Sequence, residues 1–198
     1  GFIGPNGAGK STTMRMITGF IPPSSGSVSI CGFDMSESPL EAKARIGYLP
    51  ENAPLYNNMT VTEFLVFCAK LRGLSGKELD DRVGAVLDMC FLRPVANQCI
   101  DTLSKGYKHR SCFAQSVIHD PDVLILDEAI ATVAYNLLDK ENIDELIDLF
   151  KKNKRFELIM TGHKLWEGLE EKADLITEMR KVKHYFDNGI PARLGIEF

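Results

Sequence analysis

Apolar residues in this chain occur in two patterns. Short apolar runs are typical of buried strands, and a spacing of three or four residues is typical of helices. The run Val123–Leu126 is apolar at every position, as in a parallel strand covered on both faces. Shorter patterns predict strands at Val28–Ile30, Ile46–Leu49 and Leu158–Thr161. Helical spacing predicts helices over Lys10–Thr18, closed by Gly19, and over Lys140–Phe150. Strands that alternate with helices indicate an α/β fold with a mostly parallel sheet.

The middle of the chain has only helical periodicity. Thr60-x-x-Glu63 has the spacing of a capping box, and Ser75-x-x-Glu78 repeats it. The first predicted helix places four residues on one face: Phe64, Phe67, Cys68 and Leu71. The second has a stripe of five: Leu79, Val83, Val86, Leu87 and Cys90. We expect an α-helical subdomain over residues 53–101, inserted in a core made of residues 1–52 and 102–198. A further helix follows Ser104 and ends at Asp120-Pro121.

Composition limits the function classes. The 198 residues are 44% hydrophobic, which is enough for a sizeable core. A net charge of −4, from 23 basic and 27 acidic side chains, lacks the basic excess that drives binding to nucleic acid, so we expect no nucleic-acid partner. No apolar run approaches the ~20 residues needed to span a bilayer, so we expect no direct membrane insertion. The five cysteines are scattered and odd in number, and we interpret them as structural thiols in a reducing cytosol.

The stretch GFIGPNGAGKSTT carries the most specific chemistry. Gly4-x-x-x-x-Gly9-Lys10-Ser11 matches the phosphate-binding loop template, and a strand before it and a helix after it are the context this motif requires. Glycines let backbone N–H groups close around phosphate oxygens at a helix N-terminus. Lys10 can reach the outer phosphates, and Ser11 can offer its hydroxyl to Mg²⁺. The expected nucleotide-binding residues are Gly4, Pro5, Asn6, Gly7, Ala8, Gly9, Lys10, Ser11 and Thr12.

Two acids end the predicted strand at 123–126. Asp127 can hold the same Mg²⁺ through water, and Glu128 can face the attacking water. An acidic pair at a strand end is also compatible with a solvated strand terminus, but the glycine loop favours the functional interpretation. The sequence therefore predicts a P-loop core that binds nucleotide phosphates and Mg²⁺.

Four motifs in order give the chain a resemblance to the nucleotide-binding domain of ATP-binding cassette (ABC) transporters. Besides the loop and Asp127-Glu128, it has Leu103-Ser104-Lys105-Gly106-Tyr107 where the family has its LSGGQ-like signature, and Thr161-Gly162-His163 after the next strand. The phrases IGYLPENAPLY, MTVTEFL, LSKGYKHR and VLILDE further resemble the exporter-type branch that includes gliding-motility and multidrug-export ATPases. Only Gly1-Phe2-Ile3 precedes the loop, whereas strands usually run ~5–6 residues, so we expect missing upstream sequence.

The resemblance implies roles for further residues. Ser104, Lys105 and Gly106 would act across a dimer interface on the nucleotide held by the other subunit, in the expected case a homodimer. His163 would contact the terminal phosphate and act with Glu128 and Lys10 in catalysis. Glu51 stands where most of the family has a glutamine that touches Mg²⁺, and residues 52–56 would face a transmembrane permease; a proline-rich connector is the alternative.

The resemblance implies an ATPase subunit, cytoplasmic and peripheral on the inner face of the membrane, that powers export through a separate permease. The run after Glu128 departs from the family, with Ala134 where an aspartate is expected at the dimer interface. The alternative is therefore a degenerate nucleotide-binding module that acts as a regulator or passive partner. A third class, the DNA-repair and chromosome ATPases, needs a long coiled coil between Glu51 and Ser104, and that stretch has no sustained heptads.

Overall fold

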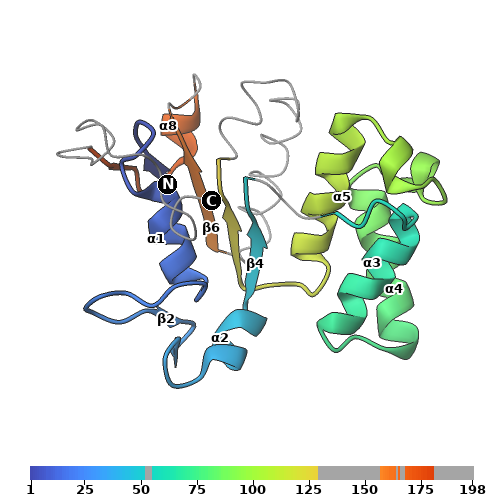
Figure 1. The fold of residues 1–198 in the computed structure, drawn as a ribbon, viewed down its shortest axis with the longest axis horizontal. Coiled ribbons are helices and arrows are strands. Elements are labelled where there is room, and N and C mark those ends of the chain that lie inside the picture. Colours follow the sequence, from blue (N-terminus) through green and yellow to red (C-terminus); the bar gives the residue numbers. More distant parts are fainter. Residues whose placement is uncertain (52–54, 129–156, 164, 166–167, 181–198) are drawn as a thin grey trace.

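The computed structural model describes residues 1–51, 55–128, 157–163, 165 and 168–180 (Figure 1). Within these ranges the longer elements alternate as the sequence predicts. The helices and strands, with two short 3₁₀ helices, are β1 (Phe2–Ile3), α1 (Lys10–Ile17), β2 (Ser29–Ile30), β3 (Phe33–Asp34), α2 (Pro39–Ala44), β4 (Ile46–Leu49), α3 (Val61–Leu71), α4 (Gly76–Met89), η1 (Arg93–Val95), η2 (Ile100–Thr102), α5 (Lys105–Val117), β5 (Val123–Leu126), β6 (Glu157–Gly162), α8 (Leu169–Lys172) and β7 (Thr177–Glu178).

A five-stranded sheet in the order β4-β5-β6-β1-β7 forms the centre of the described part, and every pair in it is parallel. Side chains of β5 alternate between the faces of this sheet. Leu124 and Leu126 belong to the core that contains α3, α4 and α5, whereas Val123 and Ile125 pack with Met14 of α1. Figure 1 accordingly shows α1 and α5 on opposite sides of the sheet. The prediction of an α/β fold with a parallel sheet is confirmed.

The helical segment between β4 and β5 agrees with its sequence pattern in most respects. Thr60 and Glu63 form the complete capping box at the start of α3, and all five residues of the predicted α4 stripe are buried. Two expectations were wrong. Ser75 stands at the N-cap of α4 without a side-chain cap bond, and Leu71 is 71% exposed because the buried face of α3 follows Val61, Phe64, Leu65 and Ala69 instead.

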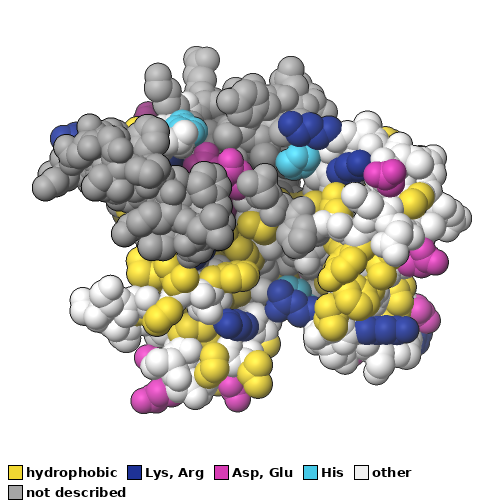
Figure 2. Space-filling view, viewed as in Figure 1, with side chains coloured by type: hydrophobic (Ala, Val, Ile, Leu, Met, Phe, Trp, Pro, Cys, Tyr) yellow, Lys and Arg dark blue, Asp and Glu magenta, His cyan; other side chains and the backbone are white. Residues whose placement is uncertain are grey.

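Two arginines link α3 and α4 to the elements beside them. Arg72, after α3, donates to the carbonyl oxygen of Lys43, in the last turn of α2, at 3.1 Å. Arg82 of α4 donates to the carbonyl oxygens of Val117 and Ile118, at 2.9 and 2.8 Å, where α5 ends. Figure 2 shows Lys and Arg side chains between two regions of exposed hydrophobic side chains on this face, one over α1–β2 and one over α3–α4.

Of the other predicted features, one strand is observed near its predicted position, and two concern residues outside the described ranges. The strand predicted at Val28–Ile30 is β2, which forms an antiparallel hairpin with β3. The helix expected over Lys140–Phe150 and the altered run that contains Ala134 lie outside the described residues. None of the described helices has the length and apolar character that a membrane crossing needs.

Candidate functional site

The glycine loop joins the end of β1 to the start of α1, and glycine is required at both of its ends. A Cβ at Gly4 would lie 2.2 Å from the Met179 carbonyl oxygen, so no side chain fits there. Gly9 has φ of 92°, a conformation that other residues rarely adopt, and it forms the N-cap of α1 without any side-chain cap bond. The first N–H groups of α1 therefore face the loop without a capping side chain, which is the arrangement that suits phosphate oxygens.

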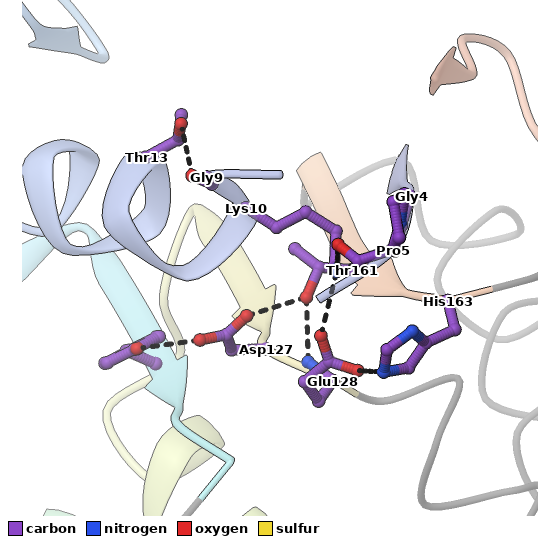
Figure 3. Close-up of polar contacts among 10 residues, drawn as sticks. Gly4, Pro5, Gly9, Lys10, Thr13, Asp127, Glu128, Thr161 and His163 are labelled. Atoms are coloured by element: carbon purple, nitrogen blue, oxygen red, sulfur yellow. Dashed lines mark hydrogen bonds and ion pairs between the residues drawn. The ribbon is translucent and has the colours of Figure 1, made fainter. Parts of the chain in front are cut away.

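Lys10 extends back along this loop rather than into solvent. Its Nζ atom donates to the carbonyl oxygens of Gly4 at 2.8 Å and Pro5 at 3.2 Å, and the residue is 4% exposed (Figure 3). The rest of the predicted loop is more open. Pro5, Asn6, Gly7 and Thr12 are exposed, and Ala8, Gly9 and Ser11 are partly exposed. Ser11 lies in the first turn of α1, one residue after Lys10.

Asp127 and Glu128 follow β5 directly and are almost fully buried, at 5% and 6% exposure. The Asp127 carboxylate accepts a hydrogen bond from the Thr161 hydroxyl at 2.7 Å on Oδ1 and a longer one, 3.4 Å, from the Tyr48 hydroxyl on Oδ2. Burial and the neighbouring Asp127 charge raise the pKa of the Tyr48 phenol well above its usual value, and Glu51 adds weakly to this shift. Tyr48 therefore stays protonated and keeps its donor for Asp127.

Glu128 lies between two basic side chains. Its Oε1 atom is 3.4 Å from Lys10 Nζ, and its Oε2 atom is 3.9 Å from His163 Nε2 (Figure 3). Glu128 Oε2 is buried and has no hydrogen-bond partner. A buried carboxylate oxygen without a donor can accept one more hydrogen bond, for example from a water molecule beside the loop.

The structure therefore brings Lys10, Asp127, Glu128 and His163 together at the carboxyl ends of β1, β5 and β6. Adjacent parallel strands end at the same edge of a sheet, which is why residues far apart in sequence meet here. The sequence analysis did not assign a role to two residues of this cluster, Thr161 and Tyr48. The available signal was a polar residue inside each of the two apolar strands that flank β5.

The other predicted residues make none of the hydrogen bonds or ion pairs of this cluster, although the charge of Glu51 acts on Tyr48. Glu51 follows the end of β4 and is exposed, and residues 52–54 lie outside the description. Ser104 forms the N-cap of α5, and its Oγ accepts from the Tyr107 N–H at 3.4 Å; Lys105 is exposed and Gly106 partly exposed. Helix α5, which begins after Ser104, lies on the opposite side of the sheet from α1, whose first residue is Lys10 (Figure 1).

Two of the predicted metal ligands, Ser11 and Asp127, are suited to Mg²⁺. The Ser11 hydroxyl and the Asp127 carboxylate supply the oxygen donors that a hard cation prefers, and Asp127 is already held in one orientation by two hydroxyl groups. Among the described residues, no group of three His, Cys, Asp or Glu side chains could hold a metal by itself. A cation here would therefore take further oxygens from water or phosphate, as Mg²⁺ usually does.

Comparison with family models gives two matches. The model described as ABC transporter matches residues 1–131, which include the loop, the Ser104 segment and both acids. The model described as ATP:corrinoid adenosyltransferase BtuR/CobO/CobP matches residues 85–198, so this later part of the chain is also similar to that family. The second range excludes the phosphate-binding loop and, beyond Glu128, consists mostly of residues outside the description.

Individual relatives agree with the first model. The chain is 33% identical over 178 residues to "Uncharacterized ABC transporter ATP-binding protein YxlF" of Bacillus subtilis (strain 168), covering 90% of this chain and 57% of that protein. It is 38% identical over 133 residues to "Probable multidrug ABC transporter ATP-binding protein YbhF" of Escherichia coli (strain K12), covering 67% and 23%. The chain thus spans a little over half of the first relative and about a quarter of the second.

A solved structure shares the fold. "Structure of ATP binding subunit of ABC transporter" superposes with a TM-score of 0.77 at 29% sequence identity and covers 90% of this chain and 74% of that one. The parallel sheet, the glycine loop and the acids at its edge define a P-loop nucleotide-binding fold. Within that class, the chain belongs to the ABC transporter family.

Proposed function

We propose that this chain is the ATP-binding and hydrolysing part of an ABC transporter that powers export through a separate membrane permease. The observation that supports it most directly is the Lys10–Glu128 ion pair at 3.4 Å, which puts the cation of the glycine loop beside an acid at the end of β5. The family and the printed name of the multidrug relative support transport and export.

Each residue has a role in this proposal. Residues 4–12 bind the phosphates through backbone N–H groups, and Lys10 neutralises the outer phosphate charge. Ser11 and Asp127, with Glu51 as a further candidate, hold Mg²⁺, which when bound offsets negative charge on the phosphates. Glu128 accepts a hydrogen bond from the attacking water, and His163, which is exposed beside it, contacts the terminal phosphate.

The same proposal extends to partners. Ser104, Lys105 and Gly106, at the N-terminus of α5, contact the nucleotide of a second subunit, in the simplest case another copy of this chain. Residues 52–56 face the permease, and the protein lies on the cytoplasmic face of the membrane. We also propose the domain division stated above, with residues 53–101 as the helical subdomain, and the placement in the exporter branch related to gliding-motility ATPases.

Phosphate release from ATP, with Mg²⁺ present, tests this function. We expect the wild-type chain to release phosphate faster than Lys10→Ala, because that variant lacks the cation on the outer phosphates. Exposed Lys77→Ala on α4 is the matched control and should behave as wild type. Equal rates in wild type and Lys10→Ala, with Mg²⁺-ATP binding retained in calorimetry, would instead support the degenerate binding module. Absence of binding would exclude both functions.

A further inference from the structure

Thr161 is the residue that connects the two acids of the site to the neighbouring strand. It lies on β6, between β5 and β1 in the sheet, and is 0% exposed. We propose that Thr161 is a positioning residue for the reaction, whose hydroxyl orients Asp127 and Glu128 together. This inference rests on the proposed function, because it concerns how that site is held in its working geometry.

One oxygen atom makes both connections. Thr161 Oγ1 donates to Asp127 Oδ1 at 2.7 Å and accepts from the Glu128 backbone N–H at 2.8 Å, and both bonds are buried (Figure 3). A hydroxyl has a single proton, so its donation to the carboxylate leaves only lone pairs for the amide. The two bonds therefore have fixed directions, and the side chain of one acid is coupled to the backbone of the other.

The bond to the Glu128 amide determines where the Glu128 side chain points. Glu128 has φ of 56°, a left-handed conformation that is unfavourable for a residue with a Cβ and persists only where the surroundings impose it. From this conformation the carboxylate reaches Lys10 on one side and His163 on the other. If the Thr161 hydroxyl is lost, the buried N–H of Glu128 is left unpaired. One interaction that stabilises this backbone conformation is then missing.

Thr161 also makes the shorter of the two hydrogen bonds that the Asp127 carboxylate accepts. The other, from the Tyr48 hydroxyl, is 3.4 Å, longer than a usual O–H···O hydrogen bond, whereas the Thr161 bond at 2.7 Å has the usual length. Asp127 is a proposed magnesium ligand, so its orientation should affect the magnesium dependence of the reaction more than the binding of ATP itself.

Substitutions that remove either the hydroxyl or the methyl group of Thr161 can separate positioning from packing. Thr161→Val keeps the shape and removes the hydroxyl, and Thr161→Ser keeps the hydroxyl and removes the methyl group. Thr161→Ala and Thr161→Ser form a second pair of similar size, which decides the question if the valine variant does not fold. The matched control is Thr18→Val, since Thr18 is 4% exposed and its hydroxyl donates to the Met14 carbonyl oxygen at 2.8 Å, with the Arg15 carbonyl oxygen farther away at 3.4 Å.

Steady-state ATP hydrolysis of the full chain should be measured at varied Mg²⁺, with ATP binding in EDTA measured separately. For Thr161→Val and Thr161→Ala we expect kcat to fall about tenfold and the Mg²⁺ concentration at half-maximal rate to rise about threefold, the scale of one lost hydrogen bond. ATP binding in EDTA should stay within about twofold, and Thr161→Ser and Thr18→Val should keep kcat within about threefold of wild type.

The outcomes distinguish this inference from the function on which it rests. Normal kcat and magnesium dependence in the folded valine or alanine variant would overturn the positioning role while leaving the ATPase intact. A serine variant as impaired as alanine would also overturn it, because the methyl group would then matter and not the hydroxyl. A wild-type chain without ATP hydrolysis would overturn the proposed function, and this inference with it.

Discussion

The Nζ atom of Lys10 lies 3.4 Å from Oε1 of Glu128, and the two side chains are only 4% and 8% exposed. Lys10 is the first residue of α1, directly after the glycine loop, and Glu128 follows the end of β5, so this contact joins the end of the glycine loop to the centre of the sheet. Two buried charges of opposite sign reduce each other's cost of burial, and removal of either one leaves the other unpaired.

The first prediction concerns the stability of this pair. Lys10→Met should lower the free energy of unfolding by about 3 kcal/mol, because it leaves the Glu128 carboxylate buried without its cation. The double variant Lys10→Met/Glu128→Gln should lose less than the sum of the two single variants, since neither charge then remains. Urea unfolding of all four proteins without nucleotide measures this coupling; strictly additive costs would contradict it.

The second prediction concerns turnover. Glu128→Gln keeps the size of the side chain but removes the base beside the attacking water, so kcat for ATP hydrolysis should fall by about 100-fold or more. The variant should still bind Mg²⁺-ATP and should accumulate as an ATP-bound dimer in size-exclusion chromatography. The exposed Glu78→Gln of α4 is the control and should keep wild-type turnover. Unchanged hydrolysis in Glu128→Gln would count against the role of Glu128.

The third prediction concerns acid stability and His119. Burial first, and the nearby Arg72 second, lower the pKa of His119 from 6.5 to about 4; Arg82 lowers it further, while Asp120 and a 3.1 Å hydrogen bond to the Ile46 carbonyl oxygen oppose the shift. The folded chain thus keeps this imidazole neutral at pH values where the unfolded chain protonates it. His119 therefore contributes stability above pH 6.5 that is lost as the pH falls from 6.5 to about 4.

His119→Gln tests this assignment, because its amide can still donate to Ile46 but does not titrate. Urea unfolding at pH 7 and at pH 4.5 should show a smaller acid-induced loss of stability in the variant than in wild type. Parallel losses in the two proteins would show that other groups account for the acid sensitivity.

The fourth prediction compares two glycines. A Cβ at Gly47 in β4 would lie 2.3 Å from the Ser116 carbonyl oxygen of α5, so Gly47→Ala should cost about 2 kcal/mol or more through overpacking. At Gly84 in α4, the nearest atom to a Cβ is the flexible Arg93 guanidinium at 3.4 Å, so Gly84→Ala should instead stabilise by about 0.5 kcal/mol. Thermal unfolding of both variants checks the sign; destabilisation of equal size in both would contradict it.

Two strands of the sheet could be predicted with their bounds because each is a short, mainly apolar run. Val123–Leu126 and Ile46–Leu49 have the predicted bounds, and the Thr60–Glu63 capping box forms as its spacing indicates. Ser75-x-x-Glu78 has the same spacing but makes no cap bond. Spacing places two side chains near one another, but only the backbone at the N-cap decides whether the bond forms. Similarly, Leu71 has helical spacing with the core but lies in the last turn of α3, where it is exposed.

The sequence by itself determined the α/β class, the glycine loop and the acidic pair after β5, because these depend on residues that are neighbours in the chain. Only the tertiary structure decided that Lys10 pairs with Glu128 and that one threonine on β6 holds both acids. Those contacts depend on which strands lie next to each other. Strand order and register follow from the packing of helices on the two faces of the sheet, and no local pattern encodes them.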